Sequence, residues 1–252
     1  MRRSGSFWRM MAGLALFAIA FGYVEAAVVA YLRSMYAPLR AHYYSATAGD
    51  LFPLLSVEQL RALGPEYVAR LKIELGRELA TLLMLAGAAV AATRRPREWL
   101  AAFVLCFGIW DLSFYVFLKL LLGWPASLLT WDILFLLPAP WVGPVLAPVL
   151  VSISMIGAGW IALGREHAGR PLHMGAAGWC GVWLGGALVF AAFVADFRNT
   201  ASGGNPNAFH WWLFGVGELV ALGAFAAGMP RRRGGATTPS ASSAPSEPRG
   251  GK

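Results

Sequence analysis

Six continuous apolar stretches constrain the fold of this 252-residue chain more than any other feature. Each is close to the roughly 20 residues that an α-helix needs to cross a bilayer. A helix satisfies all of its backbone hydrogen-bonding groups within one segment, which the hydrocarbon core requires. We therefore predict six spans, at residues 10–32, 73–92, 99–122, 142–163, 175–196 and 209–228.

The composition supports an all-α integral membrane protein. Hydrophobic residues make up 58% of the chain and charged residues 13%, whereas soluble domains carry about 25% charged residues. The net charge of +8 does not point to nucleic acid, because most basic residues lie in loops and tails beside the apolar stretches, where they set orientation. The lipid bilayer is therefore the first partner that the sequence predicts.

The distribution of basic residues predicts the orientation. The connections on one side of the membrane hold Arg2, Arg3, Arg9, Arg94, Arg95, Arg97, Arg165, Arg170, Arg231, Arg232 and Arg233. Short loops rich in Lys and Arg remain in the cytoplasm. We therefore expect both termini to be cytoplasmic, in a multi-pass protein of a bacterial-type inner membrane.

The six-span membrane domain covers residues 1–230, and two of its connections are distinctive. The external loop 33–72 contains a short amphipathic helix at 56–63, which Gly64 and Pro65 should end. A further helix at 66–72 should continue into the second span. The Arg-, Ser-, Pro- and Gly-rich segment 231–252 is predicted to be a disordered cytoplasmic tail.

The second distinctive connection, 124–141, follows the third span and runs into a proline-rich stretch. Four prolines lie between residues 138 and 148, and proline breaks a helix by removing a donor and clashing with the preceding turn. We predict a short helix at 128–137, either re-entrant or interfacial, because such a short piece cannot cross the bilayer. Asp132 would then lie in its first turn and complement the helix dipole.

Carboxyl groups inside the apolar stretches are the clearest functional signal. Seven of the thirteen acidic residues lie within or at the ends of predicted spans: Glu25, Glu74, Glu78, Asp111, Asp132, Asp196 and Glu218. A charged side chain at the bilayer centre costs on the order of 3 kcal/mol and normally faces a protein interior or a wet cavity. We predict an outward-facing pocket for an ion or ligand, formed by Glu25, Arg77, Glu78, Asp111, Asp132 and Glu218.

Helical spacing refines this prediction. Glu74 and Glu78 are one turn apart, so either Arg77 or a bound cation should lie between them. Asp111 has no basic neighbour on its own helix, and we expect it to be the functional centre, either protonated or bound to a cation. Glu25, Glu78 and Asp111 should converge on one cavity. A role for Glu25 in fixing helix packing, through Arg77 or Arg33, is an equal alternative.

Small residues predict one close helix contact. Gly181 and Gly185 form a GxxxG pattern, which Gly178 and Gly186 extend, and such patterns let membrane helices approach closely.

Three classes of function remain open at this level. The first is a protein that binds or transports a small cation, a proton-coupled solute or an amphiphile. The second is a non-catalytic subunit or assembly factor that pairs with a membrane protein partner. The third is a membrane-embedded enzyme acting on a lipid-linked or apolar substrate. The sequence assigns no catalytic residue, metal ligand or cofactor, because it contains no HExxH, GxSxG, Walker A or GxGxxG motif.

Overall fold

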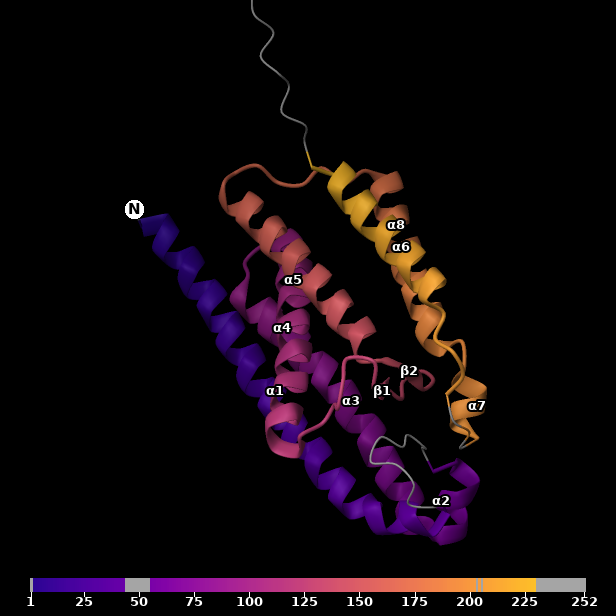
Figure 1. Ribbon diagram of the computed structural model, residues 1–252. Helices are drawn as coiled ribbons and strands as arrows, with labels where there is room; N and C mark the ends of the chain where they lie inside the picture. Colours follow the sequence, from indigo (N-terminus) through magenta and orange to yellow (C-terminus); the bar gives the residue numbers. More distant parts are fainter. Residues whose placement is uncertain (1, 44–54, 203, 205, 230–252) are drawn as a thin grey trace, which may run out of the picture.

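The computed structural model describes residues 2–43, 55–202, 204 and 206–229, so the predicted tail 231–252 lies outside the described residues. Six long helices run back and forth along the molecule (Figure 1). They are α1 (Arg2–Tyr43), α3 (Pro65–Ala92), α4 (Pro96–Leu122), α5 (Leu146–His167), α6 (Ala176–Val194) and α8 (Trp211–Ala227). The shorter elements are α2 (Val57–Leu63), α7 (Phe197–Ala201), β1 (Trp131–Phe135) and β2 (Trp141–Pro144).

Five of these helices are long and apolar enough to cross a membrane, so the chain is a multi-pass membrane protein. The sixth predicted span corresponds to α8, an apolar helix of 17 residues. This is slightly short of the roughly 20 residues that a bilayer requires, and a sixth crossing therefore remains a prediction.

The helices form two packed groups. In the first group, α4 packs against α1, α3 and α5, and in the second α6 packs along α8. Close approach depends on glycine. A Cβ atom at Gly22 would lie 2.9 Å from the carbonyl oxygen of Trp110, and one at Gly108 would lie 2.6 Å from that of Ser152. Glycine therefore brings both α1 and α5 against the backbone of α4.

The predicted GxxxG contact lies between α6 and α8, with one correction. A Cβ atom at Gly181 would lie 2.6 Å from Cβ of Ala224, and one at Gly185 would lie 2.5 Å from the backbone nitrogen of Ala221. At Gly186 a Cβ atom would meet nothing within 4 Å. Gly186 is therefore not part of the close contact, because it lies one position round the helix from Gly185.

The connections that carry the basic residues gather at one end of the molecule. Arg95, between α3 and α4, forms an ion pair with Glu166 of α5 at 3.2 Å. The ring of Phe7 in α1 stacks on His167 at 4.5 Å. The start of α1 and the end of α8 also lie at this end (Figure 1). The grouping is what the predicted orientation requires; the side of the membrane that it faces stays a prediction.

The short helices of the 33–72 loop agree with the sequence. Ser56 caps α2 with a reciprocal capping box, in which its hydroxyl accepts from the backbone N–H of Gln59 and its own N–H donates to the Gln59 side chain. Gly64, at φ 137°, ends α2, and Pro65 begins α3 at once. Proline suits a first helical position because its missing N–H would have no partner there.

The prediction of a short helix at 128–137 is wrong. This segment forms an antiparallel β-hairpin, with Asp132 opposite Gly143 and Phe135 opposite Trp141. The two prolines at 138 and 140 lie in the turn between the strands. Pairing the two strands gives the backbone N–H and C=O groups of this segment hydrogen-bond partners. A helix here would lose donors to the neighbouring prolines. Asp132 consequently lies in a strand, and no helix dipole acts on it.

The hairpin lies between the two helix groups (Figure 1). Leu134 and Trp141 pack against both hydrophobic cores, the one built on α1, α3 and α4 and the one built on α6 and the start of α8. The ring of Trp141 lies 5.6 Å from Phe135 and 4.8 Å from Phe190 of α6. Aromatic contacts of the hairpin therefore join the two groups.

Substituting Gly185 with alanine should destabilise the α6–α8 contact, whereas the same change at Gly186 should not. The new methyl group at 185 would overlap the backbone of α8, and overpacking typically costs about 1–3 kcal/mol. Thermal unfolding of the two purified variants in detergent checks this. Equal melting temperatures for Gly185→Ala and Gly186→Ala would contradict the close packing.

Candidate functional site

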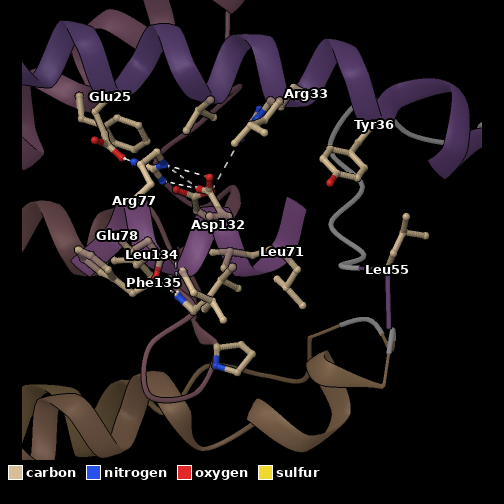
Figure 2. A pocket seen from close by; sticks show the side chains of 18 of the residues that line it. Glu25, Arg33, Tyr36, Leu55, Leu71, Arg77, Glu78, Asp132, Leu134 and Phe135 are labelled. Atoms are coloured by element: carbon tan, nitrogen blue, oxygen red, sulfur yellow. Dashed lines mark hydrogen bonds and ion pairs between the residues drawn. The ribbon is translucent and has the colours of Figure 1, made fainter. Parts of the chain in front are cut away.

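A cavity of about 520 Å³ lies between α1, α3, α4 and the hairpin. Leu55 and residues of α2 line its far end, away from the end that holds the N-terminus (Figures 1 and 2). Of the six predicted pocket residues, five line this cavity: Glu25, Arg77, Glu78, Asp111 and Asp132. The four acidic residues among them are each at most 7% exposed.

Arg77 is the centre of an ion-pair network that joins α1 to α3. Its guanidinium contacts the carboxylate of Glu25 in α1 and, one turn back along α3, that of Glu74. The Nε–H donates to both oxygens of Glu74 at 3.0 Å. Thr81 adds a hydroxyl donor to Glu25 at 3.2 Å. Glu25 therefore has the packing role that the sequence left open, while it also lines the cavity.

Glu78 holds the hairpin. Its two carboxylate oxygens accept the backbone N–H of Leu136 at 3.0 and 2.9 Å. Leu136 follows the last residue of β1, so its N–H lies beyond the strand ladder. A buried backbone donor without an acceptor is costly, and the Glu78 carboxylate removes that cost. Helix α3 thus fixes the position of the hairpin turn through one side chain (Figure 2).

Asp132 is held by residues of α1 and α4. The hydroxyl of Tyr115 donates to its Oδ2 at 3.0 Å, and the guanidinium of Arg33 lies 3.8 Å from its Oδ1. Arg33 also stacks on the ring of Trp124 at 3.8 Å. Burial raises the pKa of Asp132 to about 6, although the charge of Arg33 and the Tyr115 hydrogen bond act in the opposite direction. The pKa of Asp132 therefore lies above the ordinary range of an aspartate.

Asp111 joins α4 to α5 inside the protein. The hydroxyl of Ser152 donates to its Oδ2 at 2.8 Å. The charges of Asp132 and Asp111 are close enough to interact, and Tyr115, one turn after Asp111, lies near both. Among the described residues, no guanidinium or ammonium group forms an ion pair with Asp111 within 4.0 Å. We refer to these two buried aspartates, which both line the cavity, as the carboxyl pair, and Arg33 lies beside Asp132.

Glu218, which we predicted for the pocket, is not among the residues that line it. It lies in α8 and accepts a hydrogen bond from Ser154 of α5 at 2.8 Å. Depth along a helix, which suggested that Glu218 lines the pocket, does not specify the face of the helix.

Asp196 also does not line the cavity. Partial burial would raise the pKa of its carboxyl group, but hydrogen bonds from Asn207 and Asn199 lower it.

The charges of the cavity do not balance. Among the described residues, five carboxyl groups and three guanidinium groups line it. The set adds Glu74, Arg33 and Arg70 to the five predicted residues. Sequence spacing pointed to Glu74, which lies one turn from Glu78, but Arg33 belongs to a long loop in the sequence prediction and to α1 in the structure. If all these groups are ionised, the cavity carries a surplus negative charge of two.

Aromatic side chains form much of the remaining wall. They come from α1, α4, the hairpin and the segment before it, and include Trp110, Phe114, Tyr115 and Phe135. The ring of Trp110 lies 6.3 Å from Phe114 and 6.2 Å from Phe135. The cavity thus combines acidic groups with aromatic faces. In the described part of the chain, no group of three or more His, Cys, Asp or Glu side chains is placed to hold a metal ion.

Comparisons of the chain with protein-family models, with curated proteins and with solved structures found no match. The residues of the cavity and their contacts are therefore the basis for assigning a function to this multi-pass membrane protein.

Replacing Glu78 tests whether its carboxylate holds the hairpin. Glu78→Gln keeps an oxygen acceptor for the Leu136 N–H, whereas Glu78→Met removes it at similar size. Hydrogen bonds to charged groups contribute about 1.5–3 kcal/mol, so we expect methionine to lower the melting temperature more than glutamine does. If the two variants unfold at the same temperature in detergent, Glu78 does not act as the hairpin's acceptor.

Proposed function

We propose that this membrane protein binds a cation in the cavity and exchanges it for protons, as a carrier for a small cation or a cationic amphiphile. The observation that supports this most directly is the surplus of carboxyl groups over guanidinium groups in one cavity. Intramembrane carboxyl groups in a protein interior typically mark ion pathways and proton relays.

The contacts of the cavity indicate which groups carry the exchange. Arg77 is engaged by Glu25 and Glu74, and Glu78 by the hairpin backbone. Asp111 and Asp132 remain as a carboxyl pair, with Arg33 the cation beside it. Two neighbouring carboxylates in a buried site do not both stay ionised without compensation. A proton or a bound cation supplies that compensation, and the two compete for the same charge.

The burial of the acidic side chains argues against the alternative of a non-catalytic subunit or assembly factor. Such a protein would present its intramembrane charges to a partner helix on its lipid-facing surface. Glu25, Glu78, Asp111 and Asp132 are instead at most 7% exposed and have partners within the chain. This arrangement supports an internal binding site over a docking function.

Asp111→Asn should remove the exchangeable proton while preserving the fold. Asparagine has the same shape, and its carbonyl oxygen can still accept the Ser152 hydroxyl. We expect the infrared carbonyl band of a protonated carboxylic acid at neutral pH in the unmodified protein, and a reduced band in the variant. Proton release on adding Na⁺, Mg²⁺ or tetraethylammonium, each tested separately, should likewise fall.

Glu218→Gln is the matched control, because Glu218 is a partly buried acid that does not line the cavity. It should leave proton release unchanged. The proposed exchange is wrong if Asp111→Asn behaves like the unmodified protein in both measurements, or if Glu218→Gln alone abolishes proton release.

Cation binding should weaken as the pH falls through about 6, the pKa of Asp132. The sign follows from the charge: protonation below that pH makes the carboxyl group neutral and removes its attraction for a cation. Asp132→Asn should flatten this part of the profile. Binding titrations across the pH range would contradict the assignment if the unmodified protein bound the cation more tightly in acid.

A further inference from the structure

The aromatic wall of the cavity narrows the class of cation. Aromatic faces attract cations electrostatically, and cages of aromatic rings recognise quaternary ammonium groups. The wall already contains one such contact, because the guanidinium of Arg33 stacks on Trp124 at 3.8 Å. Rings of Trp110, Phe114 and Phe135 lie together and line the same cavity as Asp111 and Asp132. A bare metal ion would make no use of these faces, whereas an organic cation would.

The size and the far end of the cavity point to an apolar portion in the ligand. The volume of about 520 Å³ is within the range of about 300–1,000 Å³ that is typical of sites for small organic molecules. Leu32 of α1 and Leu71 and Leu75 of α3 line it. Figure 2 shows Glu25, Arg77 and Glu78 at one end of the view and Leu55 and Leu71 at the other. Arg33 and Tyr36 lie on the same side of that view as the leucines, so the apolar part of the lining is the leucine stretch itself rather than a whole end of the cavity.

Trp110 supplies an independent indication of a ligand. It lines the cavity and is only 4% exposed. Its Nε1–H is buried and has no hydrogen-bond acceptor among the described residues. A buried indole N–H normally finds a partner, because leaving a polar group unpaired costs free energy. A ligand with a hydrogen-bond acceptor would provide that partner.

We infer that the ligand is an amphiphilic organic cation, with a substituted ammonium group held among the aromatic rings beside Asp111 and Asp132 and with an oxygen acceptor for the Trp110 indole N–H. Its apolar chain lies along Leu32, Leu71 and Leu75 toward α2. This inference uses the cavity of the proposed function and names the class of its cation. It does not require proton exchange.

Three probes of equal length separate the features of this ligand. Hexanoylcholine has the ammonium group, an ester acceptor and an apolar chain. 3,3-Dimethylbutyl hexanoate replaces the charged nitrogen with carbon, and n-nonyltrimethylammonium lacks the ester. Binding is measured on the full chain in phosphatidylcholine nanodiscs. We expect saturable binding of hexanoylcholine, at least about tenfold tighter than that of the neutral ester, since cation–π contacts strengthen in desolvated sites.

Trp110→Phe keeps an aromatic ring and removes the N–H donor. We expect it to weaken hexanoylcholine binding about 3- to 10-fold, in line with the loss of one hydrogen bond, and to leave n-nonyltrimethylammonium binding nearly unchanged. Trp183→Phe, at an exposed position of α6 outside the cavity, should affect neither probe.

Three results would overturn the inference. The first is binding of the neutral ester as tightly as hexanoylcholine, and the second is no saturable binding of either cation. The third is an equal loss of binding for both cations in Trp110→Phe, which would give Trp110 no role as a donor. Each of these results leaves the infrared test of Asp111 standing. Conversely, binding of hexanoylcholine without proton release would refute the exchange and retain the ligand class.

Discussion

Neutralising buried carboxyl groups is the physical requirement on which this structure depends. The guanidinium of Arg77 contacts acids on two helices, Glu25 of α1 and Glu74 of α3. Without it, both carboxylates would be left in a low-dielectric interior, and breaking such a pair by removing one partner typically costs about 3–5 kcal/mol. The network also limits what the rest of the cavity can contain, because Arg77 is already shared by two acids. Further carboxyl groups there need other partners.

The hairpin takes part in this requirement through its polar contacts, and it also provides hydrophobic packing toward both helix groups. Toward α1, α3 and α4 its contacts include polar ones, through Asp132 and the backbone N–H of Leu136, beside the ring contact of Phe135 with Trp110. Toward α6 its contacts are aromatic, through Trp141. Non-helical backbone at membrane depth is tolerated only where it is buried in protein or lines a cavity. The hairpin packs on helices of both groups and lines the cavity, so its backbone meets these conditions whatever its depth.

The sequence predicted the long helices and five of the eight charged residues that line the cavity, because hydropathy and charges inside apolar runs are local signals. Carboxyl groups in apolar runs pointed to Glu25, Glu78 and Asp111 without any knowledge of packing. The hairpin was missed for the opposite reason. A short apolar run before prolines fits a helix or a strand equally well, and the acceptor that secures the turn, Glu78, lies 58 residues away along the chain. The prediction that Glu218 lines the pocket failed for a similar reason, since the depth of a residue along a helix does not determine which face of the helix it occupies.

The cavity and the junction between the helix groups share the same residues. Asp132 belongs to the carboxyl pair and also to β1, and Glu78 lines the cavity while it holds the hairpin turn. A change of charge at either acid therefore acts directly on a contact between α3 or α4 and the hairpin. Trp141 lies a few residues further along the same hairpin and packs on α6. The charge state of the cavity and the packing of α6 are thus linked through the one hairpin. Neither apolar packing nor helix propensity alone would require such a link.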